Sequence, residues 1–149
     1  MFFGETAINL DAKGRMAIPA RYREDVAEAC ADKLVLTYNA FENNSLWMYP
    51  LPEWQRVQEQ VMGLSTFDPS HRMLQRRLVG SAAHVQPDGS GRLLLPATLR
   101  QVANLERGVV LMGLGNKFEI WNEDILNRTR HEHPLSEAEP SQEMVRLVL

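Results

Sequence analysis

The sequence has little of what characterises secreted or membrane-spanning proteins. Its single cysteine, Cys30, excludes an internal disulfide and any metal site built from several cysteines. No apolar run approaches the roughly 18 residues that span a bilayer, and residues 1–5 lack the basic and apolar regions of a signal peptide. We therefore expect a cytoplasmic protein that has no membrane partner.

Motifs of the common enzyme classes are also missing. The sequence has no phosphate-binding loop, nucleophile elbow, paired metal motif or dinucleotide fingerprint. Cys30 has no candidate base near it in the sequence and is expected to pack in the core. His131 and His133 are too close together and too isolated to indicate a metal site. The sequence predicts no enzyme, no cofactor and no small-molecule substrate.

The sequence also lacks an excess of positive charge. The net charge is −3 and the pI about 5.8, which argues against a strongly basic nucleic-acid binder. The distribution is uneven, because residues 131–149 are rich in glutamate while basic residues gather elsewhere. They form one group before residue 24 and another in the middle of the chain: Lys13, Arg15, Arg21 and Arg23, then Arg72, Arg76 and Arg77. This pattern leaves room for a local basic face.

An internal repeat organises the chain. Residues 7–23 and 84–100 share the pattern D-x-x-G-R-x-x-x-P-A-x-x-R at a constant offset of 77 residues. The matched pairs are Asp11 with Asp88, Gly14 with Gly91, Arg15 with Arg92, Pro19 with Pro96, Ala20 with Ala97 and Arg23 with Arg100. We expect a first unit over 5–50, a helical connector over 51–80, a second unit over 81–124 and a C-terminal helix with an acidic tail over 125–149.

Each half is predicted to run strand, tight turn, strand, short helix, strand, turn, strand, helix. The aspartate suits the start of a turn, because its carboxylate can accept hydrogen bonds from backbone N–H groups ahead of it. Gly14 and Gly91 are expected to have positive φ. A helix is predicted over 20–31, with Val26, Ala29 and Cys30 facing the core. Asp68 and Pro69 indicate the start of a connector helix, and the three tryptophans are expected in the core.

The doubled motif, together with the length and opening of the chain, resembles the MraZ family, which belongs to the AbrB-like group of swapped-hairpin barrels. The resemblance covers nearly the whole chain and is weakest after Pro134. It implies an α+β fold, mainly β. Two tandem AbrB-like units would form one pseudo-symmetric swapped-hairpin β-barrel with short helices packed around it. Neither half has enough strands to be stable alone.

The resemblance also implies a function, which is sequence-specific binding of double-stranded DNA to regulate transcription. Family members are described as ring-shaped homo-oligomers that bind repeated promoter sites of the cell-division and cell-wall gene cluster, so we expect a nucleoid-associated protein. Arg15 would read a base edge with Asp11 orienting it, and Lys13, Arg21 and Arg23 would bind phosphates. The family's element falls again on Asp88 and Arg92, which would also contact DNA, but less directly than the first copy and with Arg92 partly structural.

Other interpretations stay open at this point. Each Asp–Arg pair could be a salt bridge that only orders its own turn. Arg72, Arg76 and Arg77 could be a solvated helix face, or could contact DNA or another subunit. Some AbrB-like proteins are antitoxins whose tail masks a toxin, so the chain could be a protein-binding module that uses its acidic tail. The second unit, which such antitoxins usually lack, favours the regulator.

Overall fold

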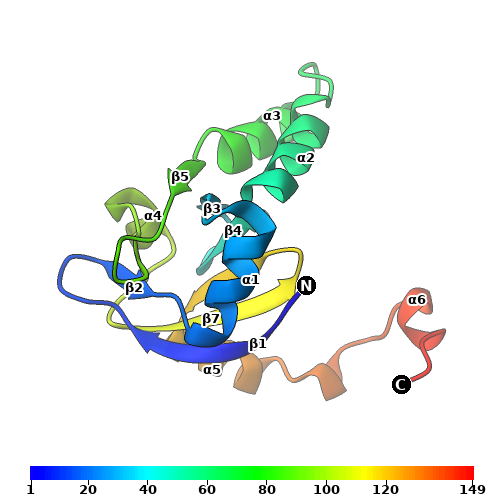
Figure 1. Cartoon of the computed structure of the whole chain (residues 1–149). Coiled ribbons are helices and arrows are strands. Elements are labelled where there is room, and N and C mark those ends of the chain that lie inside the picture. The colour runs from blue at the N-terminus through cyan, green and yellow to red at the C-terminus, as the bar shows by residue number, and fades with distance from the viewer.

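The computed structural model describes residues 1–149 and has an α+β fold, in which short helices surround an antiparallel six-stranded sheet (Figure 1). This confirms the predicted class. One order of elements occurs twice. It runs first through β1 (Phe2–Asn9), β2 (Arg15–Ala17), α1 (Ala20–Cys30), β3 (Leu34–Tyr38), β4 (Ser45–Pro50) and α2 (Leu51–Met62). It then runs through β5 (Ala83–Val85), β6 (Arg92–Leu94), α4 (Ala97–Val102), β7 (Gly108–Gly115), β8 (Phe118–Asn122) and α5 (Glu123–Glu132).

The remaining helices lie between and after these two runs. They are α3 (Pro69–Leu74) with the π-helical turn η1 (Gln75–Val79), and the short C-terminal elements η2 (Leu135–Glu137) and α6 (Gln142–Val145). Asp68 caps α3 by accepting from Ser70 N, with Pro69 at the first helical position, as predicted. Pro19 and Pro96 each stand one residue before a helix. No helix of the structure is both long and apolar enough to cross a membrane.

The strands of the two halves are exchanged in the main sheet. Its order is β1-β7-β8-β4-β3-β5, and every neighbouring pair is antiparallel. The first strand of each run therefore pairs with the later strands of the other run: β1 with β7, and β5 with β3. The pairing of β4 with β8 joins the two halves at the centre. This exchange makes each half depend on the other for its edge strand.

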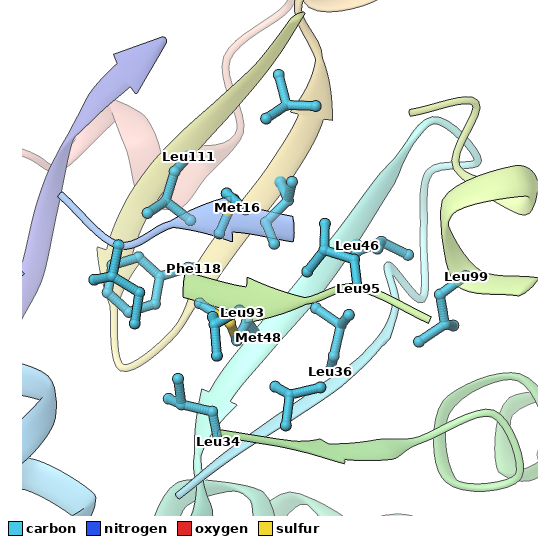
Figure 2. Close-up of a cluster of buried hydrophobic side chains, with 14 of the residues drawn as sticks. Met16, Leu34, Leu36, Leu46, Met48, Leu93, Leu95, Leu99, Leu111 and Phe118 are labelled. Atoms are coloured by element: carbon cyan, nitrogen blue, oxygen red, sulfur yellow. The ribbon is translucent and has the colours of Figure 1, made fainter. Parts of the chain in front are cut away.

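The main core lies between this sheet and a ribbon formed by β2 and β6. The two short strands pair only with each other, with Met16 opposite Leu93. Figure 2 shows both side chains among leucines from β3, β4 and β7, and both are fully buried. Strand alternation explains this placement, because successive residues of a strand point to opposite faces.

Two sequence predictions need correction. The closed barrel is not found. The edge strands β1 and β5 each have a partner on one side only, and β2 and β6 pair with each other in a separate two-stranded sheet. In α1, Val26 and Cys30 are buried as predicted, but Ala29 is exposed and Tyr22 takes the remaining core position. Residues 22, 26 and 30 follow i, i+4, i+8 spacing, which places them along one stripe of the helix.

The other face of the sheet is covered by the connector helices. Trp47 and Tyr49 of β4 pack there with Trp54 and Val61 of α2 and with Leu78 of η1. Trp121 is buried in a third cluster beneath α5. The predicted core positions of Trp47, Trp54, Trp121 and Cys30 are thus confirmed.

We predict that Leu93→Ala destabilises the protein far more than Leu94→Ala. Leu93 is 0% exposed in the core, whereas the neighbouring Leu94 is 57% exposed on the outer face of the ribbon. Truncation of Leu93 should lower the free energy of unfolding by about 2–5 kcal/mol, and truncation of Leu94 by no more than about 0.5 kcal/mol. Urea denaturation measures both values. Equal losses would show that the ribbon does not bury its inner face.

Candidate nucleic-acid interface

The two Asp-x-x-Gly-Arg turns have the same backbone geometry. In the first, Asp11 Oδ1 accepts from the backbone N–H groups of Lys13 and Arg15, each at 2.9 Å. In the second, Asp88 Oδ1 accepts from Ser90 N at 2.8 Å and from Arg92 N at 3.0 Å. The predicted role of the aspartate in closing the turn is therefore confirmed in both copies.

A glycine with positive φ completes each turn, as predicted, with φ of 80° at Gly14 and 74° at Gly91. Each glycine also lies under an arginine from the other half. The guanidinium of Arg100 covers Gly14, and that of Arg23 covers Gly91. Both arginines are themselves fixed, because Arg100 Nε donates to Leu95 O and Arg23 Nε to Ile18 O, each at 2.9 Å.

Backbone hydrogen bonds tie the turns to the ribbon. Ile18 N donates to Gly91 O at 3.0 Å, and Leu95 N donates to Gly14 O at 3.1 Å. Each turn is thus attached to the strand that leaves the opposite turn. The two turns form one rigid unit instead of two independent hairpin tips.

The motif arginines lie on the outer face of this ribbon. Arg15 pairs with Leu94 and Arg92 pairs with Ala17, while Met16 and Leu93 between them point into the core. This register makes Arg15 and Arg92 diagonal neighbours on one face, where both side chains are half-buried. The ribbon thus brings two arginines that are far apart in the sequence to the same solvent-facing surface.

Asp11 links these two arginines. Its Oδ2 accepts from Arg15 Nε at 2.6 Å and lies 3.6 Å from Arg92 Nη1. Asp88 Oδ2 lies 3.6 Å from Arg92 Nε, beyond hydrogen-bonding distance, and Arg92 Nε is buried with no hydrogen-bond partner. Arg15 is therefore the more tightly paired of the two. The interpretation of each pair as a salt bridge within its own turn accounts for only part of this network, since Asp11 also reaches the second copy.

The hydrogen bonds stabilise the ionised form of both carboxyls. The backbone N–H of Arg15 and its guanidinium hold the pKa of Asp11 below its usual range. The backbone N–H groups of Arg92 and Ser90, with the charge of Arg92, do the same for the pKa of Asp88. Both aspartates are therefore negative at neutral pH, and the outer face of the ribbon carries two positive and two negative groups.

The other basic residues predicted for DNA contact lie in three different places. The side chain of Lys13 is exposed within the first turn. Arg23 lies over the second turn and not over its own. Arg21 stacks on the Tyr22 ring at 4.6 Å and lies beside Gly4, most of the length of β1 away from Asp11. The structure thus brings Lys13, Arg15 and Arg23 to the ribbon but not Arg21.

Sequence reasoning missed Arg100, which supports the first turn. The repeat pattern contained the signal, because Arg100 is the counterpart of Arg23, but their crossed placement is visible only in the fold. In the connector, Arg72 Nη1 donates to Thr66 O at 2.7 Å and Arg77 Nε to Asn39 O at 2.8 Å. These two arginines hold loops, while Arg76 remains exposed.

We predict that Gly14→Ala costs more stability than Gly91→Ala, and that Gly89→Ala costs nearly nothing. A Cβ at Gly14 would lie 2.6 Å from Arg100 Nε, whereas the closest atom at Gly91 is 3.2 Å away and Gly89 has none within 4 Å. Strain at positive φ and displacement of Arg100 should together cost about 1–3 kcal/mol. Urea unfolding of the three variants ranks their losses of stability. Equal losses for Gly14→Ala and Gly89→Ala would show that Arg100 does not pack on the first turn.

We predict that acidification weakens the turns through Asp11 and Asp88. A carboxyl with a lowered pKa in the folded state contributes stability above its unfolded pKa of about 3.9, and this contribution is lost as the pH falls through the folded pKa. NMR titration of the carboxyl carbons should give midpoints below about 3.9. Asp11→Asn should reduce the loss of stability between neutral and acid pH. A midpoint at or above the ordinary pKa of an aspartate would show that these hydrogen bonds do not stabilise the ionised carboxyl.

The chain is similar to known proteins over almost its whole length. A family model described as "MraZ protein, putative antitoxin-like" matches twice, over residues 1–77 and 78–148. A protein of Stenotrophomonas maltophilia (strain R551-3) is 51% identical over 123 residues, which is 83% of each chain. One of Xanthomonas campestris pv. campestris (strain 8004) is 44% identical over 149 residues, the whole of both chains. One of Thioalkalivibrio sulfidiphilus (strain HL-EbGR7) is 46% identical over 144 residues, 95% of each.

Each of these three relatives is named transcriptional regulator MraZ. That name describes a role in transcription and not an enzymatic one. The similarity extends across both turns, the ribbon and the connector, and agrees with the resemblance that the doubled motif indicated. This chain belongs to the MraZ family.

Proposed function

We propose that this protein regulates transcription by binding specific sites on double-stranded DNA through the outer face of the β2–β6 ribbon. The observation that carries the proposal is the juxtaposition of Arg15 and Arg92 on that face, each beside an aspartate that can orient it. The names of the relatives support a role in transcription.

The geometry suits the reading of a major groove, which admits a two-stranded ribbon. The guanidinium of Arg15 donates to Asp11 through Nε alone, so its two terminal nitrogens are available for the O6 and N7 atoms of a guanine. Such a bidentate contact discriminates against other bases by about 1–3 kcal/mol. Arg92, with Asp88, would make a second contact in the same groove.

Phosphate contacts would fix the register of the ribbon on DNA. Lys13 extends from the first turn, and Arg23 lies over the second, so the two residues flank the ribbon. We assign phosphates to both, and also to Arg21 beside Gly4, at a greater distance from the turns. Because counterions are released from each neutralised phosphate, binding should weaken steeply with salt.

We further propose the division into two units over 5–50 and 81–124, the connector over 51–80 and the C-terminal segment over 125–149. The two matches to the family model, which meet between residues 77 and 78, support this division. By the family resemblance, the protein would form a ring-like homo-oligomer on repeated promoter sites of the cell-division and cell-wall gene cluster, in the nucleoid. Repeated sites would raise affinity through effective concentration, which an acidic chain with few basic contacts requires.

A second candidate function is that of an antitoxin-like protein-binding module. The description of the matched family includes "antitoxin-like", and the acidic segment after Glu132 leaves apolar side chains exposed. The ribbon would then have no need to distinguish one DNA sequence from another, so DNA binding separates the two candidates.

We predict that the protein prefers the DNA upstream of its own gene over a scrambled duplex, and that Arg15→Ala loses this preference. The loss of a bidentate contact worth about 1–3 kcal/mol corresponds to a fall in affinity of roughly 5- to 150-fold. Lys13→Ala should weaken binding to both duplexes and reduce the salt slope by about 1. Fluorescence anisotropy across a salt series measures both effects.

Arg128→Ala provides the matched control, because Arg128 is an exposed arginine on α5 and lies outside the ribbon. Its affinity and its preference should match those of the wild type. If the wild type binds both duplexes equally even at low salt, the reading of DNA by the ribbon is wrong, and the protein-binding function becomes the better candidate.

A further inference from the structure

The C-terminal segment exposes apolar side chains without packing them on the rest of the molecule. We define the tail as residues 135–149, which contain η2 and α6. Six of its large apolar residues are exposed beyond 40%: Leu135, Met144, Val145, Leu147, Val148 and Leu149. The same segment contains Glu137, Glu139 and Glu143 but only one basic residue, Arg146. An apolar segment with negative charge of this kind is unusual as a free surface.

A groove of complementary character lies elsewhere on the molecule. We define the Val102 groove by its apolar lining, to which β3, the loop after it, α3 and α4 contribute: Tyr38, Ala40, Met73, Leu74 and Val102. Met73 and Val102 are 65% and 48% exposed, so the groove offers apolar surface that no part of the chain covers. Ser70, Arg76 and Arg77 complete its lining, which contains no acidic residue.

The charges of the groove fit those of the tail. Arg77 is held in place, because its Nε donates to Asn39 O and its Nη2 to Glu42 O. Arg76 is exposed on the same helical turn, and its side chain makes no hydrogen bond or ion pair. A peptide that combines apolar side chains with glutamates would cover the apolar lining and bring a carboxylate to Arg76.

The two surfaces lie at opposite ends of the molecule. The tail leaves the body after α5, which packs on β7 and β8, whereas α3 and η1 lie at the other end (Figure 1). A contact between them is therefore best made between two copies. Because the groove and the tail are different patches, such a contact is heterologous, and repeating it produces a closed ring when the rotation between copies closes.

We infer that the tail of one copy docks in the Val102 groove of the next copy and that this contact links the subunits of the oligomer. The inference rests on the proposed oligomer and assigns it a surface and a segment. It makes the connector helices a subunit interface and leaves the β2–β6 ribbon free for DNA.

Light scattering after size-exclusion chromatography tests the inference on the full-length chain. Val102→Glu in the groove and Leu147→Glu in the tail should each raise the concentration at half-assembly by about tenfold or more. Met62→Glu, a similarly exposed position on α2 outside the groove, should leave assembly unchanged. Because Leu147 and Arg76 are exposed, changes there do not disturb the core.

A charge exchange provides a second, independent measurement. Arg76→Glu and Glu143→Arg should each weaken assembly, and the chain that carries both changes should recover it. Mixing the Val102→Glu and Leu147→Glu chains should give pairs, because one intact groove and one intact tail remain. Pairs that stop at two copies are the expected signature of a head-to-tail contact.

Three results would overturn the inference: a wild type that stays monomeric at every concentration, variants that assemble like the wild type, or mixed variants that form no pairs. Mixed variants would form no pairs if each tail docked in the groove of its own chain. Binding to a duplex with a single site reports on the ribbon alone. Failure of DNA reading with intact tail-dependent assembly would thus reject the proposed function only, and the reverse result would reject only this inference.

Discussion

Three residues of β2 pair with three residues of β6, and this short ladder determines both the core and the charged surface. Because side chains alternate along a strand, the register that buries Met16 and Leu93 also places Arg15 and Arg92 outside. A slip by one residue would reverse this arrangement, bury the arginines and expose the core residues. The apolar core therefore fixes the arginines more strongly than the salt bridges do, since those lie at a partly exposed surface.

The exchange between halves extends from the strands to the turns. Arg23 covers the glycine of the second turn and Arg100 that of the first, so that each unit stabilises the conformation of the other. The strand pairs β1–β7 and β3–β5 follow the same rule. Nearly all contacts that define the ribbon are thus between residues distant in sequence, which requires both halves to fold together.

Local patterns predicted the local structure well. Asp11, Gly14 and their counterparts determine the turn by side-chain acceptance and positive φ, and both effects act within five residues. The repeat also indicated the order of elements in each half. The open sheet and the crossed positions of Arg23 and Arg100 were not predictable in this way. They depend on which strand becomes the partner of which, and no spacing within one half encodes that choice.

The charge balance of the ribbon bears on how an acidic protein could read DNA. Asp11 contacts both arginines, and its lowered pKa keeps it ionised at neutral pH, so the outer face has little net attraction for phosphates. Base edges would still be recognised, because hydrogen-bond geometry and not net charge selects a guanine. A single copy would then distinguish one DNA sequence from another but bind each of them weakly. Tight binding would require several copies on adjacent sites. A subunit contact through the Val102 groove, whose lining contains no residue of the ribbon or of its two turns, would supply those copies without occupying the proposed DNA surface.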